Sequence, residues 1–181
     1  MSMMTAQSRQ SLGDSFCRAA KLGLVRAPED ALQIEPLESL QFATRPGEGV
    51  LVITTSSFAF RLLTIFHVAA TPESLAYYGD RAGEQKLEVS FAEFANLCCG
   101  ALNRELSSHF PHLAMSIPYS LSSQCLGCLD ELKPEYLSRY AITINDSVRL
   151  EATLCMCCSA PVEIVATAGV AEETTGELEL F

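Results

Sequence analysis

The sequence has no tryptophan, only three histidines and few basic residues, with 12 Lys and Arg against 22 Asp and Glu and a net charge of −10. This balance argues against a nucleic-acid partner, whose phosphates require a basic surface. No apolar run reaches the roughly 18 residues that span a bilayer, and the polar segment 1–10 lacks the apolar core of a signal peptide. We therefore expect a cytoplasmic protein without a membrane segment. The hydrophobic fraction of 49% predicts a single folded domain.

The eight cysteines do not follow the spacing of a common metal site. Cys125 and Cys128 form a C-x-x-C pair, and Cys155 and Cys158 have the same spacing. The 26 residues between the two pairs exceed the roughly 15–20 of a common zinc ribbon, so the pairs do not match that pattern. We expect reduced, mostly buried thiols and no metal, because such thiols behave as small apolar side chains. A cysteine-based metal or redox protein is a competing interpretation. A Cys/His hydrolase is less favoured, because the histidines have no convincing triad context.

Hydrophobic periodicity, turn residues and helix boundaries divide the chain into alternating helical and extended segments. They predict helices at 5–24, 71–79 and 87–109, hairpins at 50–69 and 137–158, a connector at 28–49, extended structure at 113–126, a loop at 127–136 and a short strand at 161–166. This order predicts an α+β fold with long helices packed on one side of a mostly antiparallel sheet. We divide the chain into an N-terminal helix and connector (1–49), a main domain (50–170) and an acidic tail (171–181).

The helix predicted at 87–109 has two different faces. At about 100° per residue, one stripe contains Phe91, Ala95, Cys98, Leu102, Leu106 and His109. The opposite stripe contains Glu93, Asn96, Gly100, Asn103 and Ser107. The first stripe is mostly apolar and should face the sheet, whereas the second lacks the Lys and Arg of an ordinary solvated face. It also contains a mid-helix glycine, which costs about 1 kcal/mol relative to alanine. We expect this second stripe to face a partner.

The run from Glu93 through Asn96 to Gly100, followed by Pro118, resembles the CheX, CheC and FliY family of chemotaxis phosphatases. The family motif is a Glu, an Asn three residues later, a Gly four further on, and a proline about two dozen residues after the Asn. The resemblance includes the element order over most of 50–158. A single copy of the motif and an N-terminal helix are more similar to CheX than to CheC.

The resemblance implies a phosphatase acting on the phospho-aspartate of a CheY-like receiver domain. The receiver would supply the Mg²⁺ and a lysine, so this chain needs no cofactor. Glu93 would pair with the receiver lysine and Asn96 would orient the attacking water. Val89, Gly100 and Asn103 would contact the partner, and Val89 stands where the family often has Ser or Asp.

The resemblance also implies a homodimer, and the predicted strands leave sheet edges that a second copy could cover. The alternative interpretation is a non-catalytic module of the same fold that binds a receiver or another signalling partner. A phosphate-release assay on a phosphorylated receiver distinguishes the two.

Overall fold

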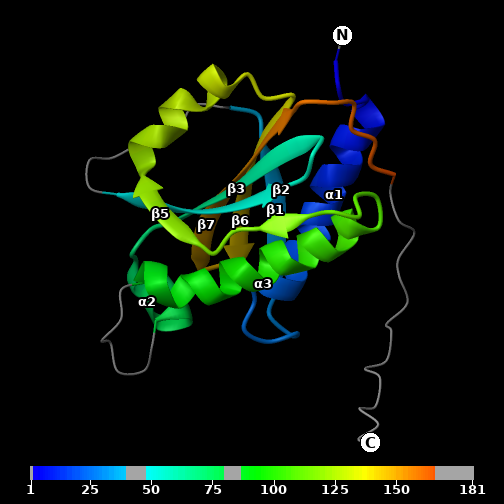
Figure 1. Ribbon diagram of the computed structural model, residues 1–181. Coiled ribbons are helices and arrows are strands. Elements are labelled where there is room, and N and C mark those ends of the chain that lie inside the picture. Colours follow the sequence, from blue (N-terminus) through cyan, green and yellow to red (C-terminus); the bar gives the residue numbers. More distant parts are fainter. Residues whose placement is uncertain (1, 40–47, 80–86, 166–181) are drawn as a thin grey trace, which may run out of the picture.

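The computed structural model describes residues 2–39, 48–79 and 87–165. In chain order the elements are α1 (Ala6–Gly23), β1 (Leu32–Leu37), β2 (Gly49–Ser56), β3 (Phe60–Val68), α2 (Pro72–Tyr78), α3 (Leu87–Ser107), β4 (Ala114–Met115), β5 (Tyr119–Ser122), the 3-10 helix η1 (Ser123–Leu132), β6 (Tyr136–Ile144) and β7 (Val148–Cys158). The seven strands form one sheet in the order β1-β6-β7-β3-β2-β4, with β5 also paired to β2 (Figure 1). Every pairing between these strands is antiparallel, so the α+β prediction is confirmed.

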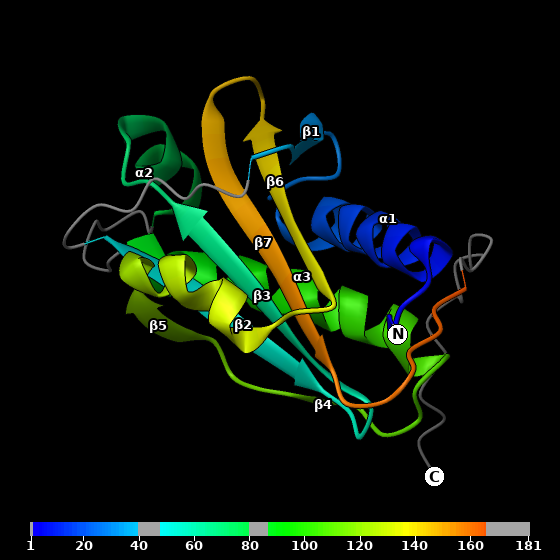
Figure 2. The same cartoon turned by 90° about the horizontal axis from the view of Figure 1, so that it is seen from above.

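The two faces of the sheet are covered differently. Helices α1 and α3 lie against one face and enclose the main core, which includes Phe16, Phe66 and Phe91. Helix η1 lies across the other face (Figure 2) and closes a smaller core with Leu126 and Leu129. The prediction of a loop at 127–136 is therefore wrong over most of that range, because η1 extends to Leu132. The extended structure predicted at 113–126 is confined to the short strands β4 and β5.

The predicted connector at 28–49 contains an unexpected strand, β1, which pairs with β6. Its burial alternates between half-buried and exposed positions, because it lies at the edge of the sheet. Pro36 lies within it, and a proline inside a short run argues against a strand except at such an edge. This edge position explains why the strand was missed. Residues 40–47 of the connector lie outside the described residues, as do residues 166–181 with the acidic tail.

The two predicted hairpins are present, with one shift at the first turn. Asn145 and Asp146 have φ of 49° and 57° in the turn between β6 and β7, as a tight turn in this position requires. The first turn lies at residues 57–59 rather than at Ser56-Ser57, and it places Phe58 at the tip with 90% exposure. The strand predicted at 161–166 is reduced in the described residues to one parallel bridge between Met4 and Val162.

Helix α2 begins as predicted at Thr71-Pro72, with a reciprocal cap. Ser74 N donates to Thr71 Oγ1 at 3.2 Å, and Thr71 N donates to Ser74 Oγ at 3.1 Å. Tyr78 at the other end packs on Phe91 and Phe94 of α3, with ring centroids 4.9 Å apart in each pair. The cap therefore helps to hold a helix that supports α3.

Replacing Thr71 with alanine removes the acceptor for Ser74 N and should lower the free energy of unfolding by about 1 kcal/mol. Urea unfolding followed by circular dichroism measures this change. Thr71→Ser keeps the hydroxyl group, so its free energy of unfolding should be close to that of the wild type. Equal stability of Thr71→Ala and the wild type would show that the cap contributes nothing.

Helices α1 and α3 touch through their backbones at Gly23. A Cβ atom at this position would lie 2.1 Å from Cys98 N and 2.3 Å from Cys98 Cα. Only glycine allows this approach, because a real Cβ cannot come so close to backbone atoms. At another point of the same interface, Arg18 Nη2 pairs with Glu105 Oε2 at 2.6 Å. The position of α3 is thus fixed by α1 directly beside the residues that follow Asn96.

Candidate functional site on helix α3

The buried stripe of α3 is confirmed. Phe91, Ala95, Cys98, Leu102 and Leu106 are all buried against the sheet and α1. His109, the last predicted member, is only half-buried and lies beyond the helix, which ends at Ser107. The stripe fixes the rotation of α3 about its axis, and therefore which side chains point outward.

Glu93 and Asn96 are both exposed and lie one helical turn apart. Within the described part of the chain, neither side chain makes a hydrogen bond or an ion pair. A carboxylate and a carboxamide are thus presented side by side without internal partners. Together they provide one negative charge, two amide N–H donors and several acceptor oxygens for an external group.

Gly100 follows Asn96 by one further turn, and the space above it is open. A Cβ added there would meet only Arg104 Nη1, at 3.9 Å. Nothing in the described structure requires glycine at this position, although glycine costs about 1 kcal/mol in a helix interior. The open space above Gly100 leaves the backbone of α3 accessible at this turn.

Two exposed apolar side chains flank the pair. Val89 is 56% exposed and Leu97 is 61% exposed. Together with Glu93 they form an i, i+4, i+8 row along α3, so one carboxylate lies between two apolar contacts. Leu97 was missed from the sequence, although it lies four residues after Glu93 on the same side of the helix. An apolar residue outside the apolar stripe was the signal that could have found it.

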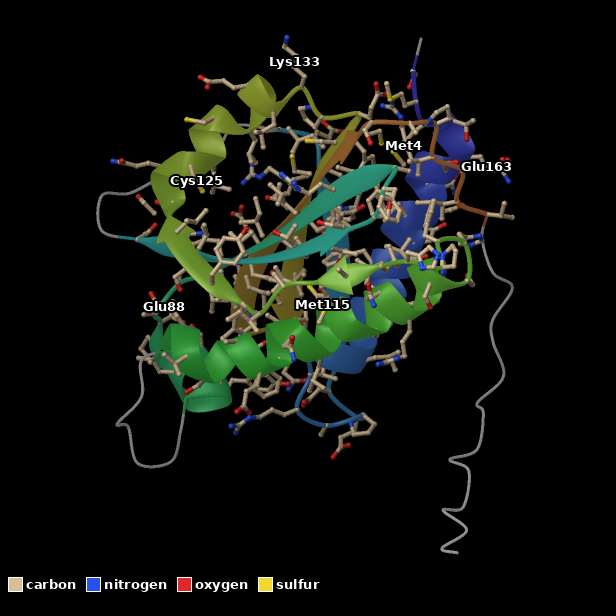
Figure 3. All side chains as sticks on the ribbon, in the orientation of Figure 1. Met4, Glu88, Met115, Cys125, Lys133 and Glu163 are labelled. Carbon is tan, nitrogen blue, oxygen red and sulfur yellow. The ribbon has the colours of Figure 1, made fainter. Side chains whose placement is uncertain are left out.

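Asn103, predicted to contact the partner, lies differently from Asn96. It is half-buried, and its Oδ1 is buried without a hydrogen-bond partner among the described residues. The structure therefore brings Glu93, Asn96, Val89 and Gly100 together on one open face, and it turns the oxygen of Asn103 inward. Figure 3 shows this helix, with Glu88 labelled at its first turn and Met115 on β4 above it.

The cysteines lie apart from this face. Cys98 and Cys99 are buried on the opposite side of α3, and burial raises the pKa of Cys99 to about 12. These thiols therefore stay protonated at neutral pH and pack as apolar groups. Of the other cysteines only Cys155 is buried; Cys17, Cys125, Cys157 and Cys158 are half-buried and Cys128 is exposed, so the prediction of mostly buried thiols is wrong for five of the eight. Among the described residues, no cluster of His, Cys, Asp or Glu could hold a metal ion.

No helix in the described ranges combines the length and the apolar character needed to cross a bilayer.

No protein-family model matches the sequence, and no curated protein matches it. Solved structures do match. A chain of the CheX–CheY–BeF3–Mg²⁺ complex from Borrelia burgdorferi superposes with a TM-score of 0.54 at 10% identity, covering 84% of this chain and 99% of that chain. The chemotaxis protein CheX from Vibrio vulnificus gives a TM-score of 0.49 at 11% identity, covering 81% and 96%.

The chain is an α+β protein with a CheX-like fold, as the superposition on the Borrelia burgdorferi structure shows over nearly the whole of that chain. At 10% identity the match establishes the fold and assigns no residue a role.

Proposed function

We propose that this protein is a phosphatase that hydrolyses the phospho-aspartate of a CheY-like receiver domain. The observation that carries the proposal is the exposed, internally unpartnered pair Glu93 and Asn96 on α3, in a chain with the CheX fold. The matching Borrelia burgdorferi structure is a complex of CheX with CheY, BeF3 and Mg²⁺, which supports a receiver as the kind of partner.

We assign Asn96 the role of orienting the attacking water. Phosphoryl transfer depends on positioning and on charge neutralisation more than on covalent chemistry by the protein. A carboxamide can accept a hydrogen bond from the water and donate another toward a phosphoryl oxygen, and it adds no negative charge. The Mg²⁺ that neutralises the phosphoryl group would be held by the receiver. The described residues of this chain need to contribute only orientation.

We assign Glu93 the role of docking the receiver. A carboxylate between the exposed side chains of Val89 and Leu97 can pair with a lysine of the receiver while the apolar groups exclude water from the contact. Gly100 lets the partner backbone approach α3 closely. This arrangement separates binding, through Glu93 and its apolar neighbours, from chemistry at Asn96.

Replacing Glu93 with alanine should raise the receiver concentration needed for half-maximal rate by about 5- to 20-fold, because one interfacial ion pair is lost. The maximal rate should change little. Steady-state phosphate release from a receiver loaded with acetyl phosphate measures both quantities. Raising the salt concentration should weaken wild-type docking more than docking of the variant, since salt screens the ion pair.

Glu88→Ala is the matched control for this experiment. It removes the same charge from an exposed position on another side of the same helix. If it raised the half-maximal concentration as much as Glu93→Ala, the effect would come from net charge, and the docking role of Glu93 would be wrong.

A non-catalytic binding module is the second candidate. The exposed apolar side chains of Val89, Leu97 and Ile117 favour it, because they provide docking area without chemistry. Such a module would bind a phosphorylated receiver without accelerating phosphate release. The same assay, run with a binding measurement, separates the two functions.

A homodimer is a further part of the proposal. All four residues of β5 are exposed at the sheet edge, including Tyr119 and Leu121. Light scattering of the purified protein tests for a second copy that covers this edge.

A further inference from the structure

A groove of about 730 Å³ lies on the face of the sheet opposite α3, between the C-terminal end of η1 and the β2–β3 turn. In Figure 3, Cys125 lies in the first turn of η1 and Lys133 directly follows its last residue. The floor is formed by β2, β3 and β7, and the walls by β5 and the end of η1. The groove is therefore separated from Glu93 and Asn96 by the sheet and the main core.

The strand register places three polar groups in one row across the floor. Ser56 pairs with Arg61, and Arg61 pairs in turn with Cys157. Neighbouring side chains in such a row lie about 5 Å apart on the same face. The side chain of Arg61 thus leaves the sheet between those of Ser56 and Cys157.

Arg61 has no acidic partner in the described part of the chain. Arg9, Arg18 and Arg139 each pair with a carboxylate, whereas Arg61 is exposed and makes no ion pair within the described ranges. Among the residues that the structure describes, no Asp or Glu lines the groove. In a chain with a net charge of −10, a groove lined by one arginine and by no described carboxylate favours an anionic ligand.

The walls of the groove are apolar and are held by hydrogen bonds. The Tyr119 hydroxyl lies 3.0 Å from Thr54 Oγ1, which fixes the ring on one side. On the other side, Cys157 Sγ donates to the Leu132 carbonyl oxygen at 3.6 Å. The side chain of Leu132 is 49% exposed and Tyr119 is 38% exposed, so both have free apolar surface.

We propose that this groove binds a small organic anion with a carboxylate or phosphate group on a flat apolar body. Arg61 forms a forked pair with the anionic group, and the Ser56 hydroxyl donates a further hydrogen bond. The apolar body lies between Tyr119 and Leu132.

A second groove, of about 520 Å³, differs in its charge: its arginine, Arg149, shares the lining with acidic residues.

The test is a titration of the ¹⁵N-labelled full chain, followed by amide chemical shifts, with benzoate and phenyl phosphate as probes. Benzamide, neutral and similar in shape to benzoate, and inorganic phosphate, without an apolar body, are the comparison ligands. We expect saturable shifts at the groove for at least one organic anion, with affinity about tenfold or more above benzamide and inorganic phosphate. The stronger of the two organic anions identifies the anionic group.

Arg61→Gln should weaken the binding by about tenfold or more, and Arg149→Gln, the matched control in the other groove, should leave it within about twofold. Unchanged shifts elsewhere in the spectrum show that each variant is folded. The proposal is overturned if neither organic anion gives saturable shifts at about 10 mM, if benzamide binds as well, or if both variants weaken binding equally. These results do not depend on phosphatase activity, so the two proposals can fail separately.

Discussion

Replacing Asn96 with alanine is expected to lower the rate of receiver dephosphorylation by about 100-fold while leaving receiver binding largely intact. Such a loss corresponds to about 2.7 kcal/mol of transition-state stabilisation, a reasonable contribution from orienting one water molecule. The carboxamide is exposed and has no internal partner among the described residues, so its removal leaves no buried group unsatisfied. The effect should therefore appear in the maximal rate and not in the stability.

Phosphate release from a receiver loaded with acetyl phosphate measures the rate, and fluorescence anisotropy of a labelled receiver measures binding. Asn96→Asp should be at least as impaired, because a carboxylate repels the phosphoryl group while keeping the shape of the side chain. Ser108→Ala, a change at an exposed position just beyond α3, is the control and should be fully active. A fully active Asn96→Ala variant would exclude Asn96 as the water-orienting group.

Replacing Gly23 with alanine is expected to lower the free energy of unfolding by about 2 kcal/mol or more. Alanine is favoured over glycine by about 1 kcal/mol in a helix, but the added Cβ would meet the backbone of Cys98 at 2.1 Å. Backbone atoms cannot rotate away as a side chain can, and overpacking typically costs about 1–3 kcal/mol or more. The clash should therefore outweigh the gain in helix propensity, and the two helices should move apart.

Gly100→Ala is the matched control, since it makes the same change in the facing helix where the space is open. It should raise the free energy of unfolding by about 1 kcal/mol. Thermal unfolding measures both: for a chain of this size, 2 kcal/mol corresponds to a shift of about 4–8 °C. If both variants changed the melting temperature in the same direction, the contact at Gly23 would not be the tight one that the structure describes.

The sequence predicted best the features that depend on local periodicity. The apolar stripe of α3, the start of α2 at Thr71 and the turn at Asn145 each follow from residues within a few positions of one another. The exposed pair Glu93 and Asn96 follows from that same stripe, because fixing the buried face of a helix also fixes the opposite one.

The features that were missed depend on contacts between distant segments. Strand β1 has a weak pattern of its own and is held by its pairing with β6. Extended structure and then a loop were predicted where η1 forms, because its apolar residues pack on a second face of the sheet that local patterns do not reveal. The need for glycine at position 23 exists only because α3 crosses α1 there. None of these can be derived from a window of neighbouring residues.

The place of β7 in the sheet has a consequence for how the chain folds during synthesis. β7 is the last strand in chain order among the described elements, yet it lies between β6 and β3 near the middle of the sheet. Until it emerges, β2 with β3 and β1 with β6 have no strand to join them. The apolar residues of the earlier strands therefore stay incompletely covered until the final third of the chain has been synthesised. Such long-range strand pairing is slow, and nascent chains with exposed apolar surface tend to associate with one another.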